Sequence, residues 1–469
     1  MSTVTERVNG VVHEAPLVVV AGFGAAGAAA AVAAAESGAR VLVCDRAPAV
    51  DRGGNTRENL FYMSMKSVDE VDPDLIAALR ASTAPAETAA AGWGVDREFL
   101  SAWIEDAAPT LKWLRQLGFE FSYSESDIID DGFAPGLMPH GGGNVMLDVL
   151  EDKAKRLGVQ FAYETALVDI RTGEDGTVTH VVLESAGARR SVSAQAVILA
   201  TGGFHGNYEL MTQYLGPRAR YAVPLTRYAY YNKGEGLRVA LGLGAATTGD
   251  LGEWHGLTID ARAKGERWVV GGGPLGIMVN TDGRRFVDEA LWEPAEKAVR
   301  DQPGGTAFYL LDAEGSRHPF YERRFSSGGA PLRANTIEEL AELIDVSPEE
   351  LARTVAEYNA ACDADSAGGG AGTSLDIPKT DGAVPLTEAP FEAWPVQAGI
   401  CFSLGGLRVD AHGRVLSLDG RPIPGLYAAG DVAGGYFGEY VNYTSSLKAL
   451  VLGRRSGCHA STSESSPTA

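Results

Sequence analysis

The stretch that most constrains the fold is LVVVAGFGAAGAAAAVAAAESGARVLVCDR, residues 17–46. It predicts a buried strand over residues 17–21, an alanine-rich helix that ends near Gly38, and a second strand over residues 40–44. Residues 22–27 fit the G-x-G-x-x-G pattern, whose glycines allow a tight turn, close approach to a pyrophosphate and packing of helix on strand. Asp45 stands where an acidic residue binds a ribose hydroxyl, which argues against a 2′-phosphorylated cofactor. A tight strand–helix turn would explain the glycines alone, but the complete set predicts a dinucleotide site.

Residues 15–35 are apolar over a length that could span a membrane. Glycines interrupt the run and no basic segment precedes it, so we expect a strand and a helix of a globular domain, and no membrane span. The net charge of −21 argues against nucleic acid as a partner. The four cysteines form no CxxC pattern, which predicts no metal site and fits a cytoplasmic protein.

Three further glycine-containing stretches bear on the choice between NAD and FAD. AVILATGGF (residues 196–204) and GLYAAGD (residues 425–431) are typical of buried strands that end in glycine or acid. RGGNTREN (residues 52–59) follows the second strand as a glycine-rich loop. These stretches return the chain to one elongated ligand several times, as FAD requires and NAD alone does not. We therefore predict FAD as the cofactor.

The rest of the chain alternates strand-like and helix-like segments, which predicts an α/β architecture. Residues 336–362 predict two helices, with Thr336 and Ser347 as N-caps. The final segment, ASTSESSPTA, predicts a disordered tail.

With these motifs in view, the sequence resembles the flavoproteins of the fumarate reductase, succinate dehydrogenase and 3-ketosteroid Δ1-dehydrogenase superfamily. Within that group it is most similar to FAD-dependent tricarballylate dehydrogenases. The similarity runs from about residue 18 to residue 457 and includes GGNTREN, GGFHGNYELMTQYLGP, LGIMVNTDGRRFVDE and GRPIPGLYAAGD. The resemblance implies a doubly wound, Rossmann-like FAD-binding domain interrupted by a smaller α+β capping domain. The implied boundaries are residues 1–255 and 386–469 for the FAD-binding domain and residues 256–385 for the capping domain.

The motifs and the resemblance together give the expected cofactor contacts. Family members with covalent flavin carry a histidine immediately before the threonine of the glycine-rich loop. Asn55 occupies that position here, so non-covalent FAD is implied. The expected cofactor-binding residues are Gly22, Gly24, Ala25, Ala26, Gly27, Asp45, Arg46, Gly53, Gly54, Asn55, Thr56, Gly142, Gly143, Ala166, Ala200, Thr201, Gly202, Gly203, Gly430, Asp431, Ser445 and Ser446.

The resemblance also implies three catalytic candidates. Tyr440 aligns with a carboxylate-binding arginine of fumarate reductases and with a tyrosine of the dehydrogenases, although the proline and glycines of the related NYPGG motif are absent. His255 falls where the superfamily places a substrate-contacting histidine, and Arg317 lies within one residue of a proton-donating arginine. The alternatives are aromatic packing for Tyr440, a hydrogen-bonded domain-boundary residue for His255, and an exposed loop cation for Arg317.

The implied function is that of an FAD-dependent dehydrogenase that desaturates a CH–CH bond beside a carbonyl or carboxylate of a small molecule, with hydride transfer to flavin N5. The reverse reaction, reduction of an activated alkene, is the alternative, and a non-catalytic flavin-binding protein is a third possibility. The chain carries no recognisable haem or iron–sulfur ligand set. Either enzyme would therefore exchange electrons with an external partner, such as oxygen, a quinone or a protein.

Overall fold

The structure is a computed structural model that describes residues 5–8, 11–14, 17–59, 63, 65–73, 76–77, 97–124, 136–266, 268–271, 275–319, 321–325, 328–366, 375–441 and 444–462. Within these residues, no helix has the length and apolarity needed to cross a membrane. The apolar run near the N-terminus forms part of a globular unit, as expected. The last helix continues to Thr462, and the remainder of the predicted tail lies outside the described residues.

A six-stranded sheet forms the centre of the larger unit, with strand order β22-β23-β13-β3-β4-β9. Its strands β23, β13, β3, β4 and β9 pair in parallel, and β22 is an antiparallel edge strand. In that order, the strands span Arg414–Leu416, Pro422–Ala428, Ala196–Leu199, Leu17–Ala21, Arg40–Cys44 and Gln160–Ala162. The central strands are continuous runs of buried valine, isoleucine and leucine, because both faces of the sheet are covered.

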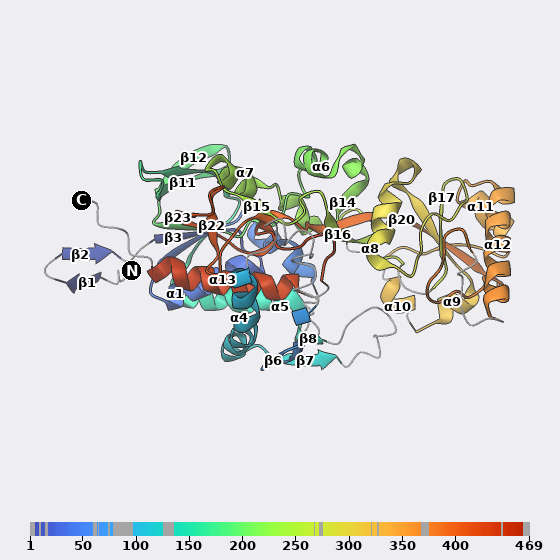
Figure 1. Cartoon of the computed structure of the whole chain (residues 1–469), viewed down its shortest axis with the longest axis horizontal. Coiled ribbons are helices and arrows are strands. Elements are labelled where there is room, and N and C mark those ends of the chain that lie inside the picture. The colour runs from blue at the N-terminus through green and yellow to red at the C-terminus, as the bar shows by residue number, and fades with distance from the viewer. Residues whose placement is uncertain are drawn as a thin grey trace.

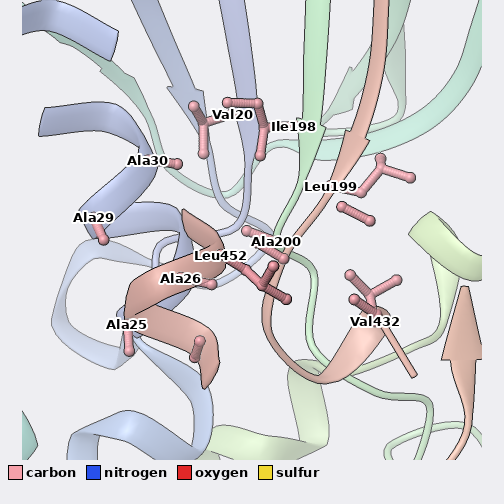
Figure 2. Close-up of a cluster of buried hydrophobic side chains, with 14 of the residues drawn as sticks. Val20, Ala25, Ala26, Ala29, Ala30, Ile198, Leu199, Ala200, Val432 and Leu452 are labelled. Carbon is pink, nitrogen blue, oxygen red and sulfur yellow. The ribbon is translucent and has the colours of Figure 1, made fainter. Parts of the chain in front are cut away.

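Helices cover one face of this sheet. The helix α1 (Ala25–Glu36) packs against α13 (Ser445–Thr462) and α5 (Gly142–Arg156), and α4 (Arg97–Gln116) packs on α13 (Figure 1). The α1–α13 contact is close because both helices present small residues. A Cβ atom on Gly453 would lie 2.2 Å from the Ala26 carbonyl oxygen. Figure 2 shows Ala26 of α1 beside Leu452 of α13, below the ends of the central strands.

The opposite face is covered by a three-stranded antiparallel sheet of β10 (Ala166–Thr172), β11 (Val178–Ser185) and β12 (Ala188–Ser193). Helix α7 (Glu235–Gly242) packs on β10, and α6 (Tyr208–Leu215) lies beyond it (Figure 1). Three hairpins complete this unit: β1–β2 (Thr5–Val8, Val11–Glu14), β5–β6 (Met65–Ser67, Glu70–Val71) and β7–β8 (Phe121–Ser124, Gly136–Pro139). The short strands β15 (Thr247–Thr248) and β21 (Gly406–Leu407) also pair. The predicted α/β class is confirmed.

The second unit is built on another six-stranded sheet. The long strand β20 (Phe391–Ser403) pairs with β14 (Ala222–Pro224), β16 (Trp254–Asp260), β18 (Ala307–Leu311) and β19 (Leu332–Ala334), and β17 (Ile277–Asn280) extends β18. Its helices are α8 (Trp292–Arg300), α9 (Ala313–Arg317), α10 (Tyr321–Arg324), α11 (Ile337–Leu343) and α12 (Pro348–Ser366). Thr336 accepts a hydrogen bond from Glu339 N, and Ser347 accepts one from Glu350 N, so both predicted N-caps are confirmed.

Strands β16 and β20 run between the two units (Figure 1). The first half of β20, including Ala393 and Val396, belongs to the apolar cores of the second unit, whereas Ala398 and Ile400 belong to the core of the first. We call residues 270–396, whose buried side chains form the second and third apolar cores, the capping unit. The implied domain bounds at residues 256 and 385 stay predictions.

Candidate flavin-binding site

A cavity of about 780 Å³, counting its open mouth, lies at the carboxyl ends of β3, β4, β13 and β23. Several separated segments of the larger unit contribute to it, in the crevice where open parallel sheets bind ligands. The predicted cofactor residues that line it are Gly22, Gly24, Ala25, Ala26, Asp45, Arg46, Gly53, Gly54, Asn55, Thr56, Ala166, Ala200, Thr201, Gly202, Gly430 and Asp431.

The glycine turn between β3 and α1 has no room for side chains at its first and third glycines. Gly22 has a φ of +99°, and a Cβ atom there would lie 2.2 Å from the Ala200 carbonyl oxygen. A Cβ atom on Gly27 would lie 2.0 Å from the Gly22 carbonyl oxygen. Helix α1 then begins at Gly24 with no side-chain cap and no acidic residue in its first turn. An anion can therefore approach this helix N-terminus, where the helix dipole favours negative charge.

Asp45 at the end of β4 supports the glycine turn from the side. Its carboxylate accepts hydrogen bonds of 2.8 Å from Phe23 N and from Ala47 N. Burial raises the pKa of Asp45 to about 6, and the two backbone hydrogen bonds oppose that rise. Each carboxylate oxygen keeps a further lone pair, so Asp45 can still accept a hydrogen bond from a hydroxyl group in the cavity.

The loop GGNT closes the other side of the turn. Gly53 and Gly54 have φ values of +109° and +54°, which favour glycine. Thr56 Oγ1 accepts a hydrogen bond of 3.0 Å from Ala25 N, which holds the loop against the start of α1. Asn55 Nδ2 donates to the carbonyl oxygen of Cys401 in β20. The loop therefore connects the pyrophosphate end of the cavity with the strand that leads into the capping unit.

Polar atoms in the cavity wall test whether a flavin nucleotide fits. Asn55 Oδ1, Thr201 Oγ1 and Glu235 Oε2 are buried and have no hydrogen-bond partner in the protein, and their residues line the cavity. Buried polar atoms without partners are costly, so they indicate a ligand that supplies hydrogen bonds. FAD has sugar and ribityl hydroxyl groups and ring N–H groups that can donate to the two acceptors Asn55 Oδ1 and Glu235 Oε2, and its phosphate oxygens can accept from Thr201 Oγ1. The residues present therefore fit it.

Several wall residues were not among the sequence predictions. Glu235, the first residue of α7, forms an ion pair of 2.8 Å with Arg46 Nε, so it joins α7 to the end of β4. Tyr231 and Asn232 precede α7, and Thr165 precedes Ala166. Glu235 follows Gly234, whose φ is +74°, at the start of α7, and no motif in the sequence marks this pair as part of a site.

Six predicted cofactor residues lie outside the cavity wall: Gly27, Gly142, Gly143, Gly203, Ser445 and Ser446. Some of them support it. Gly143 N donates to the carbonyl oxygen of Asn59, and Asn59 Nδ2 donates to Ser446 Oγ at 3.1 Å. This chain of bonds ties the starts of α5 and α13 to the end of the glycine-rich loop. Contact of these six residues with cofactor stays a prediction.

Four aromatic rings gather next to this end of the loop. The His255 ring lies 4.4 Å from that of Tyr440 and 5.4 Å from that of Phe402, centroid to centroid. Tyr440 also packs edge-on against Phe402 at 5.1 Å and against Tyr436 at 5.2 Å. We call these four residues the aromatic cluster. Two of the three catalytic candidates, His255 and Tyr440, therefore lie together.

The Tyr440 hydroxyl sits at the start of α13. It accepts hydrogen bonds from Thr444 N (3.2 Å) and Ser445 N (3.1 Å) and shares a third, of 2.9 Å, with Ser445 Oγ. Burial raises its pKa to about 12, against the opposing effect of these hydrogen bonds. The tyrosine is thus a neutral phenol at neutral pH, with its oxygen held by the helix N-terminus. Its predicted catalytic role stays a prediction.

Arg317 lies elsewhere. It is the last residue of α9 in the capping unit, its side chain is 61% exposed, and it pairs with Glu388 at 2.7 Å. Arg317 is not buried, and its hydrogen bonds with Glu388 raise its pKa above the usual value. In this arrangement Arg317 is an exposed ion-paired cation, and its predicted role as a proton donor remains untested.

A parallel sheet with helices on one face and a three-stranded antiparallel sheet on the other, a glycine-rich nucleotide cradle at its carboxyl edge and a capping unit inserted in the chain together define a class of flavin-dependent oxidoreductases. Comparison with known proteins is consistent with that class. The sequence profile of the FAD binding domain family matches residues 18–445. The chain belongs to this family.

Known relatives extend the comparison. A vinyl phenol reductase of Lactiplantibacillus plantarum is 28% identical over 495 residues, which cover 96% of this chain and 97% of the relative. A 4-oxocyclohex-2-ene-1-carboxylate 5-dehydrogenase of Sinomonas cyclohexanicum is 29% identical, over 67% of this chain and 59% of the relative. A flavocytochrome c3 fumarate reductase in its open conformation has a TM-score of 0.78 at 26% identity, over 95% of this chain and 78% of that one.

These relatives confirm the coarser predictions. The chain is an FAD-dependent oxidoreductase of the group that acts on CH–CH bonds. The predicted similarity to fumarate reductases is confirmed as well. The finer resemblance to tricarballylate dehydrogenases, the non-covalent attachment of FAD and the cytoplasmic location stay predictions.

Proposed function

We propose that this protein binds FAD non-covalently in the cavity and oxidises a CH–CH bond beside a carbonyl or carboxylate group of a small molecule. The observation that carries the proposal is the position of the aromatic cluster. Phe402 of the cluster follows Cys401, whose carbonyl oxygen accepts a hydrogen bond from Asn55 in the cavity wall. Gly22 and Asp45, which suit the nucleotide, line the same cavity. The bound FAD supplies the hydride acceptor for such a reaction.

The residues of the chain have separate tasks in this proposal. The start of α1 and the glycine-rich loop hold the pyrophosphate, and Asp45 holds the ribose. Thr201 and Asn55 supply hydrogen-bond acceptors along the cavity wall. Asn55 cannot form the covalent flavin link that a histidine makes, which supports a dissociable cofactor. Acid precipitation should release free flavin into the supernatant, and yellow colour retained in the pellet would contradict this.

The aromatic cluster favours a substrate that presents an uncharged or singly charged group to it. Tyr440 stands where fumarate reductases carry an arginine, and a phenol cannot form the bidentate carboxylate contact of a guanidinium group. Desaturation requires that an α-proton leave to a base and that charge on the carbonyl oxygen be stabilised. In the described cluster, His255, Tyr440 and Tyr436 carry groups that can hold or move a proton, and the Tyr436 hydroxyl is already bonded to Thr444 Oγ1.

The decisive experiment mixes FAD-loaded protein with saturated ketones and acids in the absence of oxygen. Rapid bleaching of the flavin absorbance by one of them, with formation of the unsaturated product, is expected. The electrons then leave to an external acceptor of the oxygen, quinone or protein kind, which steady-state assays with each acceptor would identify. No bleaching by any saturated compound would contradict the dehydrogenase assignment.

The reverse reaction is the second candidate, and the full-length similarity to a vinyl phenol reductase favours it. In that case flavin reduced by a viologen dye would be reoxidised by an alkene conjugated to a phenol, carbonyl or carboxylate. Comparing the two half-reactions on one preparation separates the candidates. We also propose that the capping unit closes over the substrate, because such a site must admit substrate and then exclude water.

A further inference from the structure

Lys448 is a buried cation that the proposed chemistry does not use. It lies in the second turn of α13, and its side chain is only 2% exposed. Its Nζ donates a 2.9 Å hydrogen bond to the Ala433 carbonyl oxygen and lies 4.6 Å from the centre of the Tyr436 ring. An ammonium group removed from water is costly unless nearby groups compensate for the loss. The backbone carbonyl and the ring face supply part of that compensation.

The loop that Lys448 contacts borders the flavin site at both ends. Its first residue, Asp431, lines the cavity, and Tyr436 belongs to the aromatic cluster. The next residue after Lys448 on α13, Ala449, also lines the cavity. The lysine therefore ties this loop, through Ala433 and the Tyr436 ring, to the helix whose start holds the Tyr440 hydroxyl.

The charges around Lys448 are few. Burial lowers its pKa to about 8, and the charge of Asp431 in η7 (Gly430–Val432) opposes that effect. Burial raises the pKa of Asp431, and Lys448 lowers it again. The phenols of Tyr436 and Tyr440 face the same region and stay neutral, because burial raises both pKa values. On the α4 side, Asp106 is paired with Arg455, two turns further along α13.

We propose that Lys448 is a positioning residue for the cofactor. The lysine fixes the loop from Asp431 to Tyr436 against α13, and it gives this side of the cavity a positive charge that favours the anionic FAD. The inference rests on the proposed FAD site. It assigns to Lys448 a role in cofactor retention and in the pH range over which the protein keeps its flavin, and no role in proton transfer to substrate.

The pH dependence has a definite sign. The pyrophosphate of FAD is negative, so its binding favours the charged form of Lys448 and raises the lysine pKa above about 8. Below pH 8 the lysine is already charged in the free protein and adds no pH dependence to the FAD affinity; a change near pH 6 belongs to Asp45, whose pKa is about 6. Above pH 8 the protein must take up a proton when it binds FAD. The affinity then falls by up to about tenfold per pH unit until the pKa of the complex is reached.

The test measures the dissociation constant of FAD at steps from pH 6.5 to pH 9.5, roughly the range around the lysine pKa. Quenching of flavin fluorescence by the apoprotein reports the binding. Four proteins are compared: the parent, Lys448→Met, Lys448→Arg and Lys297→Met. Methionine keeps the length and removes the charge, and arginine keeps the charge throughout the range. Lys297 in the capping unit pairs with Glu253 at 2.7 Å and serves as a matched lysine control away from the cavity.

We expect the parent and Lys297→Met to lose affinity above about pH 8. Lys448→Met should bind at least about tenfold more weakly at pH 7, the size of one charge-assisted interaction, and show no added loss above pH 8. Lys448→Arg should bind tightly without the loss above pH 8. If Lys448→Met retains no flavin at all, the flat profile of Lys448→Arg decides the question. A Lys448→Arg or Lys448→Met protein with the parent's pH profile would overturn the inference.

The same measurement separates this inference from the proposed function. If the parent protein binds no FAD at any pH, the FAD site itself is wrong. If the parent binds FAD and the substitutions of Lys448 leave both the affinity and the pH profile unchanged, the site stands and the role of Lys448 is wrong.

Discussion

In the wall of the flavin cavity, Thr201 Oγ1 and Asn55 Oδ1 are buried with no partner in the protein, whereas in the capping unit the buried Glu289 is fully engaged. Its carboxylate accepts hydrogen bonds from Met278 N and from Arg285 Nε and Nη2, at 2.7–3.0 Å. Lys379, also buried, lies 3.8 Å from the same carboxylate and donates to the Gly276 carbonyl oxygen.

The difference separates two uses of buried polar groups. In the capping unit, the buried charges of Glu289, Arg285 and Lys379 compensate one another, so they fix the strand β17 and the segment around Lys379 in place. The cavity wall leaves acceptors without partners and bears their cost until a ligand supplies the bonds. Substitutions in the two regions should therefore affect different quantities: the stability of the free protein in the capping unit, and the affinity for FAD at the cavity.

The largest effect is expected at the glycine turn. A Cβ atom on Gly24 would lie 3.3 Å from the Gly53 carbonyl oxygen and 3.4 Å from Thr56 Oγ1, and the γ-methyl groups of valine would extend further into the cavity. Gly24→Val should abolish FAD binding while the apoprotein stays folded. Gly242→Val is the matched control, because a Cβ atom there meets nothing within 4 Å. Normal flavin content in purified Gly24→Val protein would contradict the site.

The next effect concerns the capping unit. Glu289→Ala leaves Arg285 and Lys379 buried without their carboxylate, which should lower the free energy of unfolding by about 3–5 kcal/mol. Chemical denaturation of the apoprotein measures this loss, and the FAD affinity of the folded fraction should stay near that of the parent. Glu357→Ala removes an exposed pair with Arg353 and should cost about 0–1 kcal/mol. If Glu289→Ala reduced the free energy of FAD binding as much as the free energy of unfolding, the distinction between the two regions would not hold.

A smaller effect is expected in the aromatic cluster. If the Tyr440 hydroxyl stabilises charge on the substrate, Tyr440→Phe should slow flavin reduction by substrate roughly 10²–10³-fold, equivalent to about 3–4 kcal/mol. The substitution also removes the acceptor for Thr444 N and Ser445 N, so flavin content and stability must be measured alongside. Tyr436→Phe, which removes a hydroxyl bonded to Thr444 Oγ1 at 2.9 Å, is the control. A Tyr440→Phe rate within about threefold of the parent rules out the catalytic role, since Phe conserves shape and volume.

The sequence predicted the cradle better than the surroundings of the substrate. The glycine turn, Asp45 and the GGNT loop depend on local backbone geometry, and short motifs record such geometry well. The engagement of Tyr440 by the start of α13 was not predictable, because it depends on where the Tyr440 hydroxyl lies relative to the first backbone N–H groups of the helix. The pairing of Arg317 with Glu388 joins residues 71 positions apart.

The extent of the capping unit shows the same limit. The boundary at residue 385, which the resemblance implies, stays a prediction. Strand β20 begins after it and its two halves pack in different cores, and nothing in its sequence marks that change. Glu235 is a similar case. Its place in the cavity wall depends on the pairing with Arg46, which lies 189 positions earlier in the chain.

The smallest predicted effect compares two hydroxyl groups that are alike except in location. Thr201 Oγ1 and Thr110 Oγ1 are both buried without a hydrogen-bond partner, but Thr201 lines the cavity and Thr110 lies within α4. Valine has nearly the same shape as threonine and removes the hydroxyl group. In the free protein, either substitution should leave stability unchanged or raise it slightly, because an unpaired buried polar group is removed.

Thr201→Val should weaken FAD binding by about 0.5–1.5 kcal/mol, the net value of one hydrogen bond, and Thr110→Val should not change it. Titration of both apoproteins with FAD, together with their thermal unfolding, measures the difference. Equal FAD affinities for the two variants would mean that the Thr201 hydroxyl has no partner in the complex, and that an unpaired buried acceptor does not identify a ligand contact in this protein.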